Sequence, residues 1–316
     1  MPVNWIWFCL SWGIVMKTRL SVKQQAGMAL LSALLIMALA VILVTWIYVQ
    51  QHQVLRQARL VETVDRLQAS LVGARAFALK QIIDQPNVMK KPDAGFAPPG
   101  VTIDVQILPQ EGRFNLNSMA SGQHIERFAY LLRFIDPQLS LTAAYEISFN
   151  LKAWLSPVAR LDRQYLQRRP PYRQAHAPFV HVSELRLVKG ITPALYRNLA
   201  PYVTVLPTQA NIIDVNSVSA PVLAAVTSLP LDKAQQIIQC RNRSGRRFID
   251  MESFTRQCAA NLELDSGVLM TDATYFLVRA LARQNAQQQV LLSLVQRVKT
   301  EQGWTAQILW QEYQDE

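Results

Sequence analysis

The stretch MALLSALLIMALAVILVTWIYV, residues 28–49, decides how this chain is organised. It carries no charged side chain, and its side-chain polarity is confined to Ser32, Thr45 and Tyr48. A helix of about 20 apolar residues crosses the roughly 30 Å hydrocarbon core of a bilayer, because each residue adds about 1.5 Å. We therefore predict one transmembrane helix over residues 28–49.

The charges around this segment predict its orientation. Lys17, Arg19 and Lys23 precede it, whereas the next charge after it is Arg56. Lysine and arginine are enriched on the cytoplasmic side of membrane helices. We therefore predict a cytoplasmic amino terminus and a large domain on the outer side of the membrane.

Apolar residues continue beyond the membrane segment at helical spacing. Between Val54 and Ala78 they recur every three or four residues, and no glycine or proline interrupts residues 50–53. One helix is therefore expected over residues 28–83. The alternative is a separate juxtamembrane helix behind a flexible linker, which the lack of glycine and proline disfavours.

Alternating sequences at both ends of the remaining chain predict strands. Residues 101–108, VTIDVQIL, follow a loop rich in proline and glycine at 84–100. Towards the end of the chain the two-residue period returns three times, at about 273–284, 287–299 and 304–313. We expect an α+β fold in which the long helix packs on these four strands, joined as an antiparallel sheet.

The segment between the first strand and the last three carries signals for helices. In GRFNLNS, residues 112–118, Asn117 or Ser118 can accept the free amides of a following helix. IIDVNSVSAPVLAAV, residues 212–226, repeats this transition from a short apolar run through Asn-Ser to a helix. We predict a helical region over residues 116–267.

Composition and charge narrow the range of possible functions but do not identify one. The chain has 316 residues, of which 50% are hydrophobic, enough for about two domains beyond the membrane helix. Its formal net charge of +10 suits nucleic acid, anionic lipid or an acidic protein surface. Charge alone does not select among these partners.

The cysteines point to an oxidising compartment. Cys9 precedes the membrane segment, which leaves Cys240 and Cys258 as the cysteines of the outer domain. Two cysteines close in sequence in an exported domain suggest a disulfide that closes a local loop. Two buried thiols or a zinc site are the alternatives, and zinc is disfavoured because neither cysteine belongs to a CxxC pair.

The residues just before the membrane segment resemble a processing signal. In KQQAG-MALLSALL a basic leader ends in glycine directly before the apolar helix, as in type IV pilins and pseudopilins. The resemblance implies that a prepilin peptidase cleaves between Gly27 and Met28 and methylates the new amino terminus of Met28. A secretory signal would instead carry its small-residue cleavage site after the apolar run.

The leader implied by this resemblance is residues 1–27. Residues 1–15 do not fit it, because they place a second apolar run ahead of the basic one. We therefore expect translation to start at Met16. The alternative is a genuine second hydrophobic segment that lengthens the leader.

Further motifs resemble one pseudopilin family. GRFNLNS, PPYR (170–173), APFVHVSELRLVKGITPALYRNLAPYVTVLP (177–207) and DVNS (214–217) stand in the order found in GspK, a minor pseudopilin of type II secretion. Pilins usually carry a glutamate at the fifth mature position, where this chain has Ser32. GspK members also lack that glutamate.

The resemblance implies a pseudopilin fold interrupted by an insertion. The long helix of residues 28–83 would pack on a sheet built from residues 84–115 and 268–316. A helical domain, residues 116–267, would be inserted between the two parts of the sheet.

The resemblance also implies a structural role without catalysis. GspK is a subunit at the tip of the periplasmic pseudopilus, anchored in the bacterial inner membrane, that supports protein secretion across the outer membrane. Its neighbours are the minor pseudopilins GspI and GspJ, with GspH or the major pseudopilin GspG below them, and prepilin peptidase processes it. We expect no nucleic-acid partner.

Calcium is the one cofactor that the resemblance asks us to consider, since some GspK members bind it in the helical domain. This chain has no EF-hand loop, and its counterpart of an acidic family segment reads Lys152-Ala153-Trp154. We therefore expect no cofactor, leave calcium open as the alternative, and assign no calcium ligands. The acids of the region are scattered: Asp136, Asp162, Asp214, Asp250, Glu252 and Asp265.

A competing interpretation is a membrane-anchored DNA-binding protein of the uptake type. VSELRLVKGITPALYRNLAPYV has the outline of a helix-hairpin-helix with Lys189 and Gly190 in the hairpin, and residues 229–254 could be a degenerate second copy. Hairpin amides and nearby arginines can hold phosphates. Here the hairpin reads GIT instead of GIG, and leucine and proline replace the glycines of the second copy. The arginines concerned are Arg241, Arg243, Arg246 and Arg247.

No catalytic motif supports an enzyme. The sequence contains no HExxH, GxSxG, Walker A or dinucleotide-binding pattern. The histidines also lack metal-ligand spacing: His52, His124, His176 and His181. We expect the chain to act by assembly.

Overall fold

The computed structural model describes residues 22–84, 96–158, 162–245, 247–260 and 266–314. The chain divides into two compact units, one up to Val64 and the other from Asp65 onward. The expected start at Met16 lies outside the described residues.

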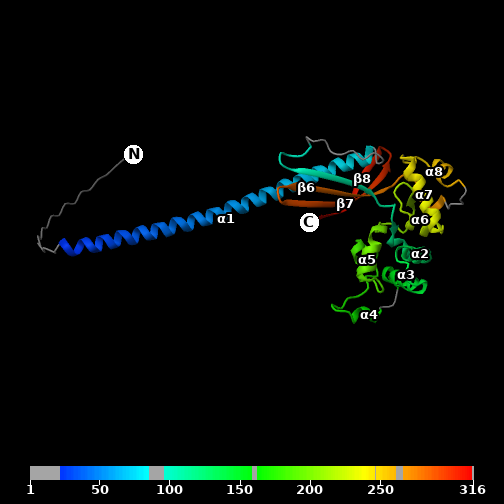
Figure 1. The fold of residues 1–316 in the computed structure, drawn as a ribbon, viewed down its shortest axis with the longest axis horizontal. Helices are drawn as coiled ribbons and strands as arrows, with labels where there is room; N and C mark the ends of the chain where they lie inside the picture. Colours follow the sequence, from blue (N-terminus) through cyan, green and yellow to red (C-terminus); the bar gives the residue numbers. More distant parts are fainter. Residues whose placement is uncertain (1–21, 85–95, 159–161, 246, 261–265, 315–316) are drawn as a thin grey trace, which may run out of the picture. The chain divides into compact units, whose positions relative to one another are not determined.

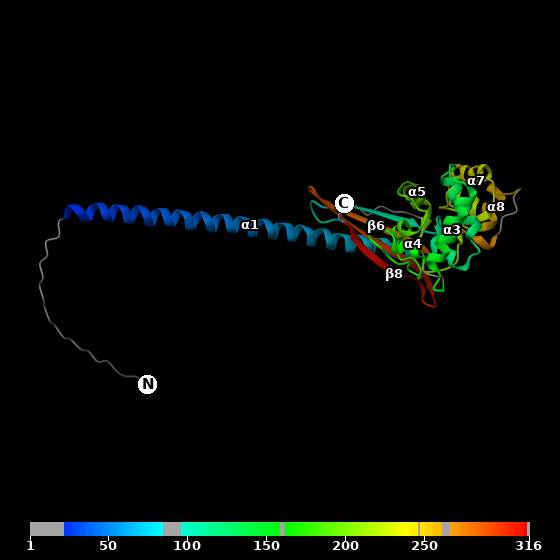
Figure 2. The same cartoon turned by 90° about the horizontal axis from the view of Figure 1, so that it is seen from below.

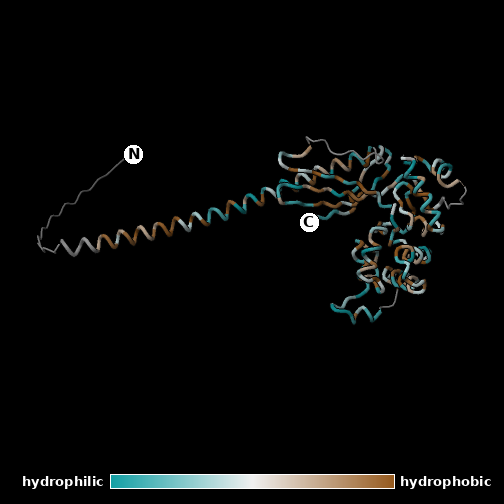
Figure 3. The backbone as a smooth tube through the Cα atoms, viewed as in Figure 1, coloured by the Kyte–Doolittle hydropathy of each residue, from teal (hydrophilic) through white to brown (hydrophobic). Residues whose placement is uncertain are grey.

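Helix α1, Val22–Asp84, is continuous over 63 residues. It starts before the predicted residue 28, because Lys, Gln and Ala of the leader are good helix formers. Residues 28–49 are exposed along their whole length, and their hydropathy is visible in Figure 3. Within the described residues this is the one helix long and apolar enough to cross a membrane.

The second unit contains the predicted four-stranded antiparallel sheet, which confirms the α+β fold (Figure 1). The strand order is β1-β6-β7-β8, so the first strand pairs with a strand more than 160 residues later. A register shift between Leu294 and Val295 interrupts the pairing of the last two strands. The strands are β1 Thr102–Pro109, β6 Tyr275–Gln284, β7 Gln287–Thr300 and β8 Gly303–Gln314.

One face of the sheet packs on the end of α1. Leu67, Leu71 and Ala78 follow the helical period and are fully buried. They belong to two apolar clusters with alternate residues of the strands, such as Val278 and Ala280. The alternation predicted from the sequence therefore puts the apolar face of the sheet against the helix.

The inserted region has its own apolar core, built from residues 114–269. Its helices gather at one end of the sheet (Figures 1 and 2). The α-helices are α2 Ile125–Ile135, α3 Leu141–Leu155, α4 Arg163–Leu166, α5 Pro193–Leu199, α6 Ala220–Thr227, α7 Leu231–Ser244 and α8 Met251–Cys258. The 3₁₀ helices are η1 Leu116–Ser121, η2 Val182–Leu187, η3 Ala200–Tyr202 and η4 Ser266–Val268.

Two short parallel strand pairs divide the insertion into two parts of unequal length that share a layout. β2 (Phe114–Asn115) pairs with β3 (Val203–Thr204), and β4 (Ile213–Asp214) pairs with β5 (Leu269–Met270). We call residues 114–204 the first repeat and residues 213–270 the second repeat. Each repeat opens with a strand, continues through Asn-Ser to a helical hairpin, and closes with a strand parallel to the first.

Candidate functional site

The membrane end of α1 carries the predicted processing residues. The bond between Gly27 and Met28 lies within the helix, six residues from its start. The Ser32 hydroxyl donates a hydrogen bond to the carbonyl oxygen of Ala29 at 2.9 Å. Because that bond satisfies the hydroxyl inside its own helix, Ser32 is compatible with a lipid environment.

The insertion is joined to the sheet at residues 110 and 111. The Gln110 amide donates to the carbonyl of Tyr275 at 2.9 Å, where the chain re-enters the sheet. The Gln110 side chain accepts the Thr204 hydroxyl at 3.1 Å. The carbonyl of Glu111 accepts the amide of Asp214 at 3.0 Å. This junction therefore connects the sheet with both repeats.

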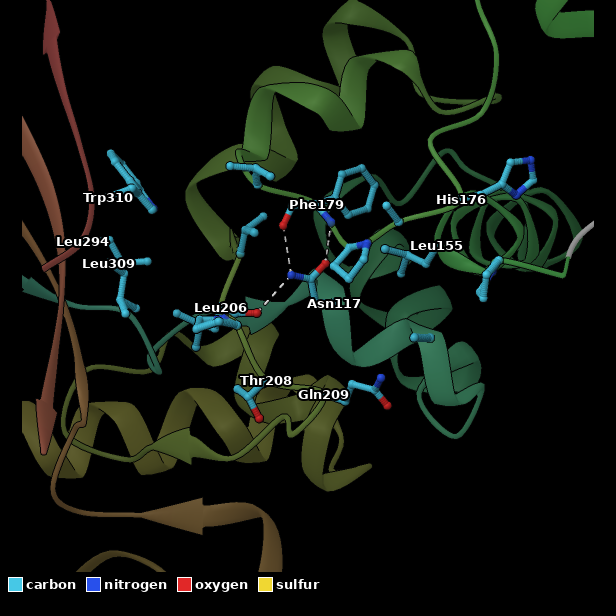
Figure 4. Close-up of a pocket in the computed structure, with 17 residues that line it drawn as sticks. Asn117, Leu155, His176, Phe179, Leu206, Thr208, Gln209, Leu294, Leu309 and Trp310 are labelled. Atoms are coloured by element: carbon cyan, nitrogen blue, oxygen red, sulfur yellow. Dashed lines mark hydrogen bonds between the residues drawn. The ribbon is translucent and has the colours of Figure 1, made fainter. Parts of the chain in front are cut away.

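A buried asparagine closes the first repeat. The Asn117 side-chain oxygen accepts the amide of Phe179 at 2.8 Å, and its nitrogen donates to the carbonyls of Phe179 and Leu206 at 3.1 and 3.0 Å. Figure 4 shows these bonds converging on Asn117. The expectation that Asn117 or Ser118 caps a helix is wrong. Asn115 accepts the amide of Asn117 at the start of η1 instead, and the Ser118 hydroxyl donates to the carbonyl of Asn115.

The second repeat uses an asparagine in the same way. The Asn216 side-chain oxygen accepts the amide of Phe248 at 2.8 Å, and its nitrogen donates to the carbonyls of Phe248 and Thr271 at 3.0 and 2.8 Å. In both repeats one amide group binds both backbone groups of a phenylalanine and one carbonyl close to the end of the repeat. The GRFNLNS and DVNS motifs therefore have the same structural role.

A cavity of about 890 Å³ lies between the first repeat and the sheet. One wall comes from Leu294, Leu309 and Trp310 of β7 and β8, and the other includes Phe179 and Leu206 (Figure 4). Most of the lining is apolar. The Asn117 amide also borders the cavity, but its oxygen and nitrogen are both bonded to the backbone.

The hairpin proposed to bind DNA is occupied by internal contacts. The amide of Lys189 donates to the hydroxyl of Tyr165 at 3.0 Å, and the amide of Ile191 donates to the carbonyl of Val188. A Cβ atom at Gly190 would lie 2.6 Å from Ile147, so the hairpin packs directly on α3. The second hairpin ends in Pro230, which has no amide hydrogen.

Two of the neighbouring arginines also point inward. Arg241 donates to the carbonyls of Val215 and Val218 at 3.1 and 2.6 Å. Arg247 lies 3.9 Å from the fully buried carboxylate of Asp214. Arg246 lies outside the described residues. Of the arginines described, Arg243 is exposed, whereas Arg241 and Arg247 are held by contacts within the second repeat.

Cys240 and Cys258 form a disulfide with their Cα atoms 5.6 Å apart. The bond joins α7 to the end of α8, both in the second repeat. Of the alternatives left open by the sequence, the structure has neither two separate thiols nor a zinc site at these two residues.

The acids considered for calcium serve local structure. Asp162 and Asp250 accept amides at the starts of α4 and α8, and Asp136 accepts the amide of Gln138. Within the described residues no three histidine, cysteine or carboxylate side chains gather as a metal site. Asp265 lies outside those residues.

The histidines make contacts typical of packing. The His52 ring lies 4.3 Å from that of Tyr48, and the His124 ring lies 6.4 Å from that of Phe114. The Nδ1 atom of His176 is 2.8 Å from the Ser156 carbonyl. His181 caps η2. They lie in different parts of the chain, and they form no metal-binding group among the described residues.

Comparison with known proteins identifies the family to which this chain is similar. A model described as type II secretion system (T2SS), protein K matches residues 112–208, and a second model with that description matches residues 213–272. The chain belongs to the protein K family of the type II secretion system. The two matches coincide closely with the first and second repeats.

Full-length relatives agree with this assignment. Type II secretion system protein K of Pseudomonas aeruginosa is 29% identical, over 88% of this chain and 90% of the relative. The protein of the same name from Aeromonas hydrophila is 26% identical, over 83% of this chain and 90% of the relative.

A solved structure has the same fold. A chain in the crystal structure of the GspK–GspI–GspJ complex from enterotoxigenic Escherichia coli superimposes with a TM-score of 0.59 at 21% identity. The superposition covers 84% of this chain and 99% of the solved one. The protein K fold therefore extends over the helix, the sheet and the insertion.

The sequence analysis did not identify the residues whose hydrogen bonds close the two repeats and join the insertion to the sheet. Asn117 and Asn216 were interpreted only as parts of helix starts, and Glu111 was not singled out. The available signal was the polar side chain itself, since an asparagine between apolar residues has to satisfy its amide where it is buried.

Proposed function

We propose that this chain is a minor pseudopilin that caps the tip of a periplasmic type II secretion pseudopilus. It would be anchored in the bacterial inner membrane, with its amino end in the cytoplasm and its second unit in the periplasm. GspI and GspJ would be its direct neighbours, with GspH or GspG below. It would support export by assembly and without catalysis.

The observation that carries this proposal is Ser32. In pilin packing the glutamate at the fifth mature position is thought to neutralise the amino terminus of the adjacent subunit. Ser32 has no charge, and its hydroxyl is bonded to Ala29. An unpaired ammonium group in the bilayer costs several kcal/mol. A subunit with serine there is therefore best placed where no other subunit lies above it.

The inserted domain supports the same position. The two repeats hold a separate core beside the sheet, and that bulk would obstruct close helical packing along a shaft. The relative in the Escherichia coli complex, of the same fold, is held with GspI and GspJ.

The test is purification of the full chain from membranes that contain the remaining pseudopilins and prepilin peptidase. We expect GspI and GspJ in equimolar amounts, and one copy of this chain per filament. Many copies per filament, in constant ratio to GspG, would show that it belongs to the shaft.

The variant Ser32→Glu sharpens this test. It supplies the missing carboxylate, so we expect more than one copy per filament. Ala33→Glu is the matched control, because its carboxylate points about 100° further round the helix. Equal copy numbers for Ser32→Glu and the unaltered chain would show that Ser32 does not limit the chain to one copy, and would leave the bulk of the inserted domain as the limiting feature.

A further inference from the structure

A loop of the first repeat carries four arginines and is closed at its base. We call residues 162–174 the arginine loop; it contains α4 and the PPYR motif. The amide of Asp162 donates to the side-chain oxygen of Gln174 at 3.1 Å, which joins the two ends of the loop. The loop lies at the outer end of the first repeat, away from α7 and α8 (Figure 1). Its arginines are Arg163, Arg168, Arg169 and Arg173.

Two tyrosines fix the arginine loop to the core of the first repeat. The buried ring of Tyr165 lies 5.6 Å from that of Trp154, and the ring of Tyr172 lies 6.3 Å from Trp154 on another side. The Tyr172 hydroxyl donates to the carbonyl of Leu187 at 2.8 Å. Arg168 donates to the same hydroxyl at 2.7 Å, and its guanidinium lies 5.5 Å from the centre of the Tyr165 ring. The loop therefore presents its arginines from a fixed base.

The arginine loop lacks acids that would neutralise it. Its single carboxylate, Asp162, caps α4 and lies 4.0 Å from Lys189, which also lies 3.9 Å from Glu146 of α3. On the adjoining η2, Glu184 is engaged in the capping box of that helix. Within the described residues no arginine of the loop takes part in an ion pair. The loop therefore presents a positive surface that a partner of opposite charge would complement.

Exposed leucines accompany these charges. Leu166 in the loop and Leu187, which is bonded to Tyr172, are 42% and 41% exposed. Arg186 precedes Leu187, is exposed as well, and lies over the ring of Tyr196 at 5.4 Å. Arginine and tyrosine are enriched in protein–protein interfaces, where lysine is depleted. The composition of this surface therefore favours a protein partner.

The backbone of the loop does not favour a phosphate ligand or a lipid headgroup. Phosphate sites in proteins commonly use free backbone amides besides cationic side chains. Pro170 and Pro171 have no amide hydrogen. The loop also belongs to no long amphipathic helix of the kind that binds anionic membranes, because α4 has four residues. Five further amides are already bonded within the loop: those of Gln164, Tyr165, Gln167, Arg168 and Tyr172.

We propose that the arginine loop, together with Arg186 and Leu187, is a docking surface for an acidic protein segment that carries aspartate or glutamate beside apolar side chains. A guanidinium group binds a carboxylate through two parallel hydrogen bonds. Tyr172 already holds Arg168 in position, so binding restricts that side chain little further. The proposal adds a partner to those of a tip subunit and does not depend on the tip position.

The test is fluorescence anisotropy with the full chain in neutral detergent, at a physiological ionic strength of about 0.15 M. The probe is a labelled peptide of aspartate and glutamate with two central leucines. The control probe has asparagine and glutamine in place of the acids. We expect the acidic peptide to bind and the control peptide to bind roughly tenfold more weakly, because it offers no carboxylate to the guanidinium groups.

Arg169→Gln combined with Arg173→Gln is the informative variant, since both side chains are exposed. We expect its affinity for the acidic peptide to fall roughly tenfold. Arg133→Gln combined with Arg243→Gln, at exposed positions on α2 and α7, is the matched control because it removes the same net charge elsewhere. It should bind the acidic peptide within about twofold of the unaltered chain.

Hydrogen exchange on the unaltered chain supplies a measurement that needs no variant. The acidic peptide should increase the protection of peptides covering residues 162–174 and leave those of α7 unchanged. An unprotected loop at a saturating concentration of the peptide would overturn the proposal.

Two binding results would also overturn it. Equal weakening in the two double variants would show attraction to net charge alone. Tighter binding of phosphatidylglycerol vesicles or of duplex DNA than of the acidic peptide would replace the protein partner with a phosphate-bearing one. None of these results affects the proposed tip position, which the copy number per filament tests.

Discussion

The first and second repeats close with the same asparagine contact but are stabilised by different means. The first repeat is the larger and surrounds Trp154 with aromatic rings, with Tyr165 at 5.6 Å and Phe179 at 6.3 Å between centroids. The second is shorter, and its Phe248–Phe254 pair is supplemented by the Cys240–Cys258 disulfide. A small core gains more from a covalent link than a large one does, because it buries less apolar surface.

The largest expected effect comes from removing Asn117 of the first repeat, and Asn216 of the second repeat provides the comparison. Asn117→Ala leaves three buried backbone groups without their partner, so we expect a loss of about 4 kcal/mol in the free energy of unfolding by urea. Asn216→Ala breaks the same bonds at a half-buried site, and we expect about 2 kcal/mol. Asn198→Ala, exposed on α5, is the control. Equal losses of unfolding free energy in Asn117→Ala and Asn216→Ala would show that the deeper burial of Asn117 does not increase its contribution.

Removing the disulfide is expected to have the next largest effect on the free energy of unfolding. This effect should be confined to the second repeat. The two cysteines are 18 residues apart, so replacing both with serine is expected to cost about 3 kcal/mol. Hydrogen exchange should rise in α7 and α8 and stay unchanged in α2 and α3. A comparable rise in the first repeat would mean that the two repeats unfold together.

The contact of Gly112, just before the first repeat, with the second repeat gives the smallest effect of the three. A Cβ atom at Gly112 would lie 2.6 Å from the Ser217 hydroxyl and 2.8 Å from its backbone. Gly112→Ala is therefore expected to cost about 2 kcal/mol through overpacking, measured by thermal unfolding.

Gly73→Ala is the control for this substitution. It would meet Phe96 at an ordinary 3.7 Å and should stabilise α1 slightly, because alanine favours helix. If both glycine variants behaved alike, Gly112 would not be in the close contact with Ser217 described above.

Periodicity predicted the parts of this fold that are long enough to show a period. The helix expected over 28–83 and the strand expected over 287–299 agree with α1 and β7 to within a few residues. The strands that close the repeats could not be predicted, since β2 and β4 have two residues each and pair with residues more than 50 positions away.

Candidate functional residues could be named from the sequence only where they would act locally. Gly27, Met28 and Ser32 depend on their place in one helix, so the sequence alone identifies them as candidates. Asn117 and Glu111 act through residues that are 62 to 164 positions distant, and no local pattern predicts such partners. A buried polar side chain becomes informative only when its contacts are known.

The most direct test of the account is the mass of the amino-terminal peptide of this chain, isolated from membranes with and without prepilin peptidase. With the peptidase we predict a chain that begins at N-methylated Met28, and without it a chain that still carries the leader through Gly27. An intact Gly27–Met28 bond in the presence of the active peptidase would contradict the assignment of this chain as a pseudopilin.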